Sequence, residues 1–311
     1  MCRRPPKRGP TNVGFAYCCV VVSTSLSSLG NLTSIMPHLD LQKQAQKIRT
    51  EVLEMIAEAK SGHPGGSLSC VEIITSLFFS QLKIDPNLPD WSERDRFVLS
   101  KGHGVPTVYA AMALKGFFDL SELRTLRKTG SRLQGHPDRV RVPGIEASTG
   151  SLGQGLSVAQ GMALAARLTN KPWHTYCVLG DGELQEGQVW EAVMSAPKFK
   201  LGGLTAIVDL NGGQIDGHTH EVMSLEPLAD KWKSFNWNVE VVDGHSFDEL
   251  IVALTAAKKQ NYFNDNPTCI IAKTVKGKGV SFMEDKIEWH GVAPNSEQLK
   301  QALKEVSEKL I

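Results

Sequence analysis

Two polar residues with the chemistry of metal ligands, Asp181 and Asn211, lie thirty positions apart, and each follows a short apolar run. The runs, 175–179 and 204–210, have the composition of strands, and the stretch 186–198 between them is typical of a helix. Parallel strands of an open α/β sheet place ligands at their carboxyl ends, so both side chains are expected at one edge. A carboxylate and an amide oxygen suit Mg²⁺, which usually also takes phosphate oxygens. The sequence therefore predicts a metal–diphosphate site.

Glycines flank the first of these ligands in the turn Gly180-Asp181-Gly182. They would let a diphosphate approach the backbone, and the helix that follows would offer it free N–H groups. Gly-Asp-Gly turns are common, so this turn alone is a weak signal of function. The asparagine after a second strand makes the combination much more specific.

Four of the nine histidines share one setting, a neighbouring glycine at the end of an expected strand or helix: His63, His103, His136 and His290. Neutral imidazoles near pH 7 can donate hydrogen bonds to a diphosphate or to sugar hydroxyls, and they can move protons. A single loop histidine is usually structural, but four in the same setting favour a functional site. Zinc binding is disfavoured because the spacings are long and irregular.

The expected strands alternate with helices along the chain, which indicates an α/β fold with a parallel sheet covered by helices on both faces. The expected strands are 96–100, 175–179, 204–210, 238–242 and 268–272. The expected helices are one capped by Asp40, 68–82, 106–115, an alanine-rich one after Gly155, 186–198, 246–258 and 296–310.

Composition limits the function further. The 311 residues carry a net charge of +1, without a basic block outside the extreme N-terminus, which argues against nucleic-acid binding. Three of the six cysteines lie in apolar runs, so we expect buried thiols in a reducing, cytoplasmic compartment; these are Cys70, Cys177 and Cys269. Residues 36–311 are expected to form the folded domain.

Residues 1–35 form a separate leader, in which a basic start precedes the apolar run 15–22. The run is shorter than the about 20 apolar residues that a membrane span needs, so no membrane insertion is expected. Two interpretations remain open: a disordered leader without function, or an upstream start codon with Met36 as the natural first residue.

Gly180-Asp-Gly182 followed by Asn211 resembles the thiamine diphosphate signature, and the neighbouring segments Gly182-Glu-Leu-Gln-Glu-Gly187 and Gln214-Ile-Asp-Gly-His-Thr219 resemble transketolase. The signature often ends in Asn-Asn, whereas Leu210 precedes Asn211 here; the ligand asparagine is still present. The resemblance implies the thiamine diphosphate-binding fold (the PP domain), with thiamine diphosphate and Mg²⁺ as cofactors.

The resemblance also assigns roles to individual residues. It implies that Asp181, Asn211 and the Gly213 carbonyl hold the metal, with Gly182 and Asn211 also against the cofactor. It places His103, His290 and Lys276 at the diphosphate, His63 and His136 at substrate hydroxyls near the reacting carbon, and Gly150-Ser151-Leu152 around the pyrimidine. The four histidines are the expected catalytic residues.

Three further positions match features of the family only in part. Glu186, also expected among the cofactor-binding residues, and Glu191 match a carboxylate network that joins two active sites across a subunit interface. Some relatives have a serine three residues after the first histidine that helps to bind substrate, whereas this chain has Gly66.

The resemblance covers residues 40–311, which correspond to about half of a full-length transketolase. The chain therefore resembles the N-terminal subunit of a split transketolase. The resemblance implies transfer of a two-carbon ketol unit between sugar phosphates, together with a C-terminal subunit that supplies the pyrimidine-binding half, in an assembly of two plus two chains. Two alternatives stay open: an α-subunit of a 2-oxoacid dehydrogenase, and an inactive cofactor-binding homologue. The sugar pair is not identified, because split enzymes of the pentose phosphate pathway and of dedicated catabolic routes share this half.

Overall fold

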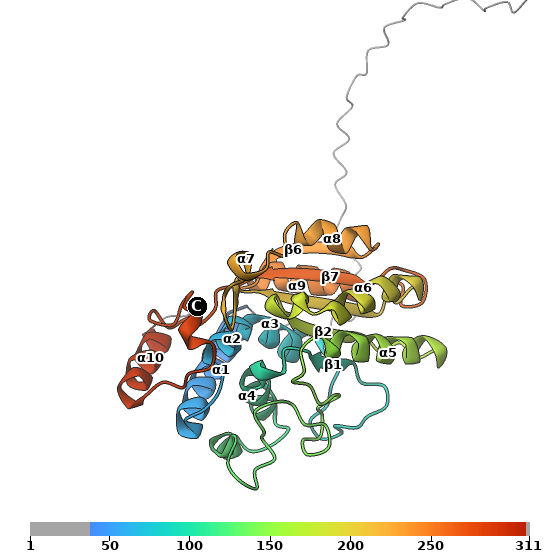
Figure 1. The fold of residues 1–311 in the computed structure, drawn as a ribbon. Coiled ribbons are helices and arrows are strands. Elements are labelled where there is room, and N and C mark those ends of the chain that lie inside the picture. The colour runs from blue at the N-terminus through green and yellow to red at the C-terminus, as the bar shows by residue number, and fades with distance from the viewer. Residues whose placement is uncertain (1–37, 309–311) are drawn as a thin grey trace, which may run out of the picture. The chain divides into compact units, whose positions relative to one another are not determined.

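In the computed structural model, which describes residues 38–308, five strands form one parallel sheet (Figure 1). The strand order is β1-β2-β3-β7-β6. The strands are β1 (Arg96–Leu99), β2 (Thr175–Gly180), β3 (Leu204–Leu210), β6 (Asn238–Asp243) and β7 (Thr268–Lys273). All five were expected from the sequence, and the α/β fold class is confirmed.

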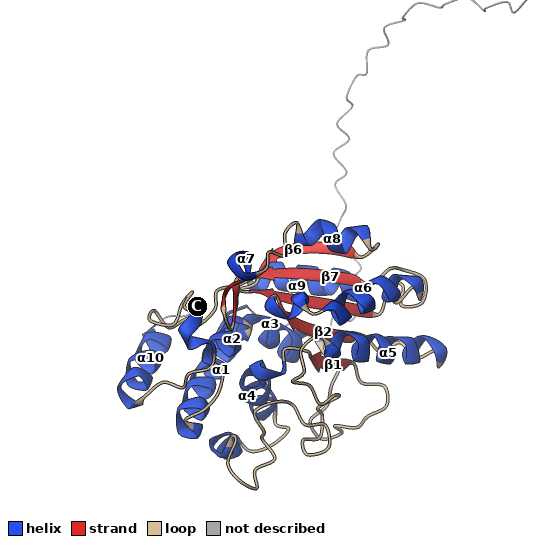
Figure 2. Cartoon of the chain, in the orientation of Figure 1, coloured by secondary structure: helices blue, strands red, loops and turns tan. Residues whose placement is uncertain are grey.

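Among the described residues, ten α-helices, one π-helix, four short 3-10 helices and a short hairpin accompany the sheet (Figure 2). The helices are α1 (His38–Ala59), α2 (Pro64–Ser69), α3 (Val71–Ser76), α4 (Val105–Lys115), α5 (Gln154–Leu168), α6 (Gly187–Lys198), α7 (Thr219–Val222), α8 (Leu228–Ser234), α9 (Phe247–Lys258) and α10 (Ser296–Glu308). The hairpin pairs β4 (Gly213–Gln214) with β5 (Gly217–His218) in antiparallel fashion. The sequence did not predict α7, α8 or the hairpin, which are all short.

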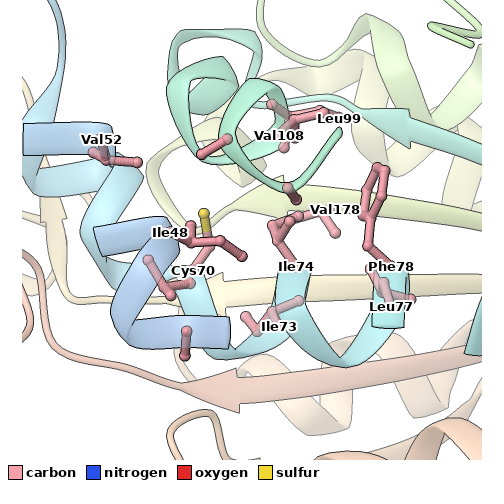
Figure 3. Close-up of a cluster of buried hydrophobic side chains, with 14 of the residues drawn as sticks. Ile48, Val52, Cys70, Ile73, Ile74, Leu77, Phe78, Leu99, Val108 and Val178 are labelled. Carbon is pink, nitrogen blue, oxygen red and sulfur yellow. The ribbon is translucent and has the colours of Figure 1, made fainter. Parts of the chain in front are cut away.

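Both faces of β1, β2, β3 and β7 are buried, because alternate side chains of these strands enter different cores, whereas the edge strand β6 is mostly exposed. On β2, Tyr176 and Val178 pack with α1, α3, α4 and α9, whereas Cys177 and Leu179 pack with α5, α6 and α8. Figure 3 shows the first core around Val178. Each fully buried large apolar side chain stabilises the fold by about 1.5–3 kcal/mol. These two cores fix the sheet whose carboxyl edge carries the polar ligands.

The start of α5 lies unusually close to the end of β1. A Cβ on Gly155 would collide with the Ser100 side chain, and Gly153 has φ +83°, so both positions require glycine. The Gly155 N–H donates to Ser100 Oγ at 3.1 Å. This contact brings the loop 150–152, which precedes the helix, to the same edge as Asp181.

Two helix boundaries differ from expectation. The helix expected over 68–82 begins earlier, with Pro64 in its first turn, and is interrupted at Cys70 (φ −98°, ψ 14°). Proline suits the first turn because its missing N–H is not needed there, and the interruption follows Ser69, whose hydroxyl reaches Asp209 on β3. Asp40 does not cap α1, because the helix already begins at His38.

Other expectations concern the cysteines and the leader. Cys70, Cys177 and Cys269 are buried free thiols, as expected. The leader 1–35 lies outside the described residues, so both interpretations of it stay open. Among residues 38–308, no helix combines the length and the apolar character that crossing a membrane requires.

Candidate cofactor site

Asp181 and Asn211 lie on neighbouring loops, because β2 and β3 are adjacent and parallel. Asp181 Oδ2 accepts from the Gly212 N–H at 2.7 Å, and its Oδ1 accepts from the Gly182 N–H at 2.9 Å. The Asn211 Oδ1 accepts from the Gly213 N–H at 3.1 Å. The two expected ligands therefore stand at one edge of the sheet.

A cavity of about 230 Å³ opens at this edge, between the loops after β1, β2, β3 and β7. Most of the expected site residues line it: His63, His103, His136, His290, Gly150, Leu152, Asp181, Gly182, Asn211, Gly213 and Lys276. Ser151 and Glu186 do not line it; both are exposed, and Glu186 immediately precedes α6. Sequence motifs thus identified most of the cavity wall.

The four histidines come from segments far apart in the sequence and form one cluster. The ring of His63 lies 5.2 Å from His103, 5.6 Å from His290 and 6.5 Å from His136, between centroids. His103 and His290 are 5.3 Å apart. The buried Nδ1 of His63 has no hydrogen-bond partner among the described residues, so this ring can still accept one from a bound molecule, or donate one.

Burial holds the histidines neutral at pH 7. It lowers the pKa of His63 to about 4, with help from the nearby cation Arg127, and that of His290 to about 3, with help from Lys276. Burial and Lys101 hold the pKa of His103 well below its usual value. The pKa of His136 is also lowered, by burial and by Arg127. Each ring therefore offers one donor and one acceptor at neutral pH.

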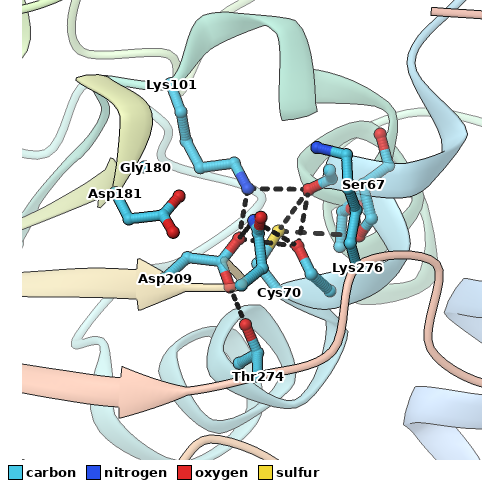
Figure 4. Close-up of polar contacts among 12 residues, drawn as sticks. Ser67, Cys70, Lys101, Gly180, Asp181, Asp209, Thr274 and Lys276 are labelled. Atoms are coloured by element: carbon cyan, nitrogen blue, oxygen red, sulfur yellow. Dashed lines mark hydrogen bonds and ion pairs between the residues drawn. The ribbon is translucent and has the colours of Figure 1, made fainter. Parts of the chain in front are cut away.

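A buried ion pair lies next to the cavity. The Lys101 ammonium donates to Asp209 Oδ2 and to the Gly66 carbonyl, and Figure 4 shows Lys101 and Asp209 pointing toward each other beside Asp181. Both side chains are at most 1% exposed. Burial alone would raise the pKa of Asp209, but Lys101 outweighs it and lowers that pKa, while Asp209 raises the pKa of Lys101 despite burial.

Asp209 also orients Asn211. The Asn211 Nδ2 donates to Asp209 Oδ2 at 3.1 Å, which fixes the amide with its oxygen away from Asp209. One lone pair of that oxygen takes the Gly213 N–H, so the second is available to a cation. Sequence reasoning missed Asp209 and Lys101, although an aspartate inside the apolar run 204–210 was a signal.

Glu183 was missed as well, and it joins three loops of the site. Its Oε2 accepts from the Gly180 N–H at 3.0 Å, and its Oε1 accepts from the Gly153 N–H at 2.9 Å and from the Ser100 hydroxyl. The loop 150–152 is held on its other side by Thr149, whose hydroxyl donates to the Leu99 carbonyl at 2.6 Å. The backbone of this loop is therefore fixed before any ligand arrives.

Lys276 carries positive charge into the cavity wall. Its ammonium lies 3.3 Å from the Gly213 carbonyl and 3.1 Å from His290 Nδ1. Burial, and to a lesser degree Lys101, lower its pKa to about 8. Within residues 38–308 it forms no ion pair with a carboxylate. A buried cation whose charge no carboxylate balances favours an anionic ligand.

Comparison with known proteins agrees with this geometry. The profile of the family "Transketolase, thiamine diphosphate binding domain" matches residues 41–307. A 6-deoxy-6-sulfo-D-fructose transketolase subunit of Clostridium sp. (strain MSTE9) is 48% identical over 272 residues, 88% of this chain and 98% of that relative. An apulose-4-phosphate transketolase subunit of Phocaeicola vulgatus is 43% identical, over 87% of this chain and 95% of its own length.

Longer transketolases match over part of their length. The solved structure of transketolase from Campylobacter jejuni superposes with a TM-score of 0.81 at 33% identity, and the match covers 88% of this chain and 43% of that chain. These findings confirm the resemblance to transketolase that the motifs indicated. They fit a transketolase subunit better than the two alternatives, a 2-oxoacid dehydrogenase subunit or an inactive homologue. The chain therefore belongs to the transketolase family, whose N-terminal, thiamine diphosphate-binding domain it contains.

Proposed function

We propose that this chain is the N-terminal subunit of a split transketolase, which transfers a two-carbon ketol unit from a ketose phosphate to an aldose phosphate. The observation that carries this proposal is the cavity in which Asp181 and Asn211, from neighbouring strands, meet four neutral histidines. Two relatives support the split arrangement, since each is named as one subunit of a transketolase, and nearly its whole length matches this chain. The buried free thiols support a cytoplasmic location.

The site residues fit thiamine diphosphate with Mg²⁺. Burial and the neighbouring Asp209 raise the pKa of Asp181 to about 6, and a bound dication would offset both effects. A Cβ on Gly182 would lie 2.7 Å from the Gln214 side chain, and one on Gly213 2.9 Å from Lys276 Cδ. At Gly182 a side chain would need the backbone to shift, because the crowding atom is the Gln214 Cβ, whereas at Gly213 the neighbours are flexible side chains. Asp181, Asn211 and the Gly213 carbonyl would hold the metal.

The remaining residues would divide between the two ends of the cofactor. His103, His290 and Lys276 would donate to the diphosphate, with Gly182 against it. The loop Gly150-Ser151-Leu152 would enclose the pyrimidine through its backbone groups. When bound, the cofactor supplies the carbanion chemistry of ketol transfer. His63 and His136 would hold substrate hydroxyls and move protons at the reacting carbon.

This division of roles predicts different effects for different histidines. His63→Ala and His136→Ala should lower kcat and raise the KM for sugar, because each loses a hydrogen bond worth about 1.5–3 kcal/mol, roughly ten- to a hundred-fold. Their affinity for the cofactor should stay near the wild-type value. His103→Ala should instead weaken cofactor binding. Equal effects of all three substitutions on both quantities would rule out the assignment.

A partner subunit would complete the site. In the family, the glutamate that activates the cofactor's aminopyrimidine and the arginines that grip the sugar phosphate belong to the half beyond this domain. We therefore propose a C-terminal partner in a symmetric assembly of two plus two chains, with each site between unlike chains. Glu186 and Glu191, both exposed on or next to α6, would join the sites across the interface.

The test is ketol transfer by the chain alone, by its C-terminal partner alone and by the mixture. Ribose 5-phosphate serves as acceptor, with xylulose 5-phosphate, 6-deoxy-6-sulfo-D-fructose or apulose 4-phosphate as donor, since relatives are named for the last two. Activity should appear only in the mixture, and the donor that gives the highest kcat/KM identifies the pathway. Full activity of this chain alone would contradict the split-enzyme proposal, and no transfer with any of the donors would contradict the function.

A further inference from the structure

We propose that Arg49, Glu72 and His245 form a buried relay that positions the loop carrying Lys276, and that these three are positioning residues for the diphosphate end of the site. The inference rests on the proposed function, because it takes the Lys276 ammonium as a ligand of the diphosphate. None of the three lines the cavity. They come from α1, α3 and the turn after β6.

The relay is a continuous chain of charged and polar contacts. The Arg49 guanidinium lies 2.5 Å from Glu72 Oε1, and His245 Nδ1 lies 2.8 Å from Glu72 Oε2. Arg49 and Glu72 are at most 1% exposed, and His245 is 12% exposed. Burial alone would raise the pKa of Glu72, but Arg49 and His245 outweigh it, so the pKa is lowered and the carboxylate stays charged.

Both ends of the relay attach to the loop, on either side of Lys276. The Val275 N–H donates to His245 Nε2 at 2.9 Å, and Arg49 Nε donates to the Lys278 carbonyl at 3.3 Å. These partners require a neutral His245 with its proton on Nδ1, since Glu72 accepts on one side and Val275 donates on the other. The relay therefore holds the residue before Lys276 and the residue two positions after it.

The surroundings leave His245 and the loop little freedom. A Cβ on Gly244 would collide with the Thr274 side chain, and the Gly244 N–H donates to the Lys273 carbonyl at 2.8 Å. Next to Lys276 itself, the Gly277 N–H donates to the Gly65 carbonyl at 3.0 Å. Because the turn after β6 packs this closely on the chain after β7, the ring of His245 is fixed against the loop.

Positioning matters here because a lysine side chain is long and flexible. No carboxylate in the described part of the chain pairs with the Lys276 ammonium, which contacts the Gly213 carbonyl and His290 Nδ1. Whether the ammonium reaches these groups and the diphosphate depends on the position of the loop backbone. A buried ion pair such as Arg49–Glu72 adds little to stability compared with apolar residues of the same shape. We therefore assign the Arg49–Glu72 pair a role in placing the loop rather than in stabilising the fold.

The experiment measures, in the presence of Mg²⁺, the thiamine diphosphate affinity of the full chain assembled with its C-terminal partner. His245→Asn keeps a donor toward Glu72 but removes the acceptor for Val275, and we expect roughly tenfold weaker binding. His245→Gln, which can again offer an acceptor to Val275, should restore most of the affinity. In a Lys276→Met background, His245→Asn should have no further effect, because the group that it positions is gone.

His174→Asn is the matched control. This histidine is also buried and bonds Thr205 at 2.8 Å, but it precedes β2, at the opposite end of the strand from the cavity. It should lower the melting temperature without changing the affinity. An unchanged affinity of His245→Asn, or an undiminished effect in the Lys276→Met background, would overturn the relay.

Hydrogen exchange of a peptide spanning residues 273–279 in the unliganded complex gives a second measurement that does not depend on the cofactor. His245→Asn should speed the exchange of this segment, and His174→Asn should not. If the wild-type complex bound no thiamine diphosphate, the proposed function would be wrong. The hydrogen-exchange rate of residues 273–279 would then be the measurement that decides whether the relay holds the loop. Unchanged exchange would overturn it.

Discussion

Asp181→Ala should abolish Mg²⁺-dependent binding of thiamine diphosphate while the fold stays intact. The substitution removes the only charged side chain among the proposed ligands of a dication that also holds the diphosphate. Stability should change little, because the loss of two N–H hydrogen bonds to the carboxylate is offset by relief of its burial and of its repulsion with Asp209, which together raise its pKa to about 6. Calorimetric titration of the reconstituted enzyme measures the affinity, and thermal unfolding without cofactor measures the fold.

Asp230→Ala is the control for this substitution. Asp230 is an exposed aspartate on α8 whose contact is a surface ion pair with Lys233. It should leave both the affinity and the unfolding temperature at their wild-type values. An Asp181→Ala enzyme that bound the cofactor with unchanged affinity would show that the metal is held elsewhere.

Breaking the Lys101–Asp209 pair should destabilise the protein strongly. Lys101→Met leaves the Asp209 carboxylate buried without its cation, and removal of one partner of a buried pair costs about 3–5 kcal/mol. That is a large part of the about 5–15 kcal/mol that stabilises an ordinary domain. The free energy of unfolding in urea, measured without cofactor, should fall accordingly. Asp209 also accepts hydrogen bonds from Ser69, Asn211 and Thr274. These three side chains should become less ordered when the Asp209 carboxylate is no longer held by Lys101.

The double variant Lys101→Met/Asp209→Leu separates the pair from other effects of the substitutions. It leaves no unpaired charge, so its loss of stability should be smaller than the sum of the two single losses. Lys171→Met, which breaks the exposed pair with Glu93, should leave the free energy of unfolding unchanged. Strict additivity of the two buried substitutions would mean that the pair has no energetic coupling.

The sequence predicted the parts of the site that depend on local pattern. Asp181 and Asn211 could be placed at one edge because each directly follows a strand, and only a helix and the second strand separate them. The four histidines could be selected because each lies beside a glycine at the end of an element. Their meeting within 5.2–6.5 Å of His63 required the folded structure.

The residues that were missed act through contacts distant in sequence. The partner of Asp209 is 108 positions away, and the relay joins positions 49, 72 and 245. These meetings depend on the strand order, in which β7 inserts between β3 and β6, and no local pattern shows that order. The interruption of the expected helix 68–82 at Cys70 was missed for a similar reason, since it adjoins a contact between Ser69 and β3.

The most direct test of the site is the position of the metal in a crystal of the reconstituted enzyme grown with thiamine diphosphate and Mn²⁺. Mn²⁺ takes the same oxygen ligands as Mg²⁺ and gives an anomalous signal that identifies it. The structure predicts one strong peak at the edge of the sheet, bound by Asp181, Asn211 and the carbonyl of Gly213, with the diphosphate completing its coordination. A peak bound by other residues, or a cofactor bound at this edge without a metal, would contradict the account.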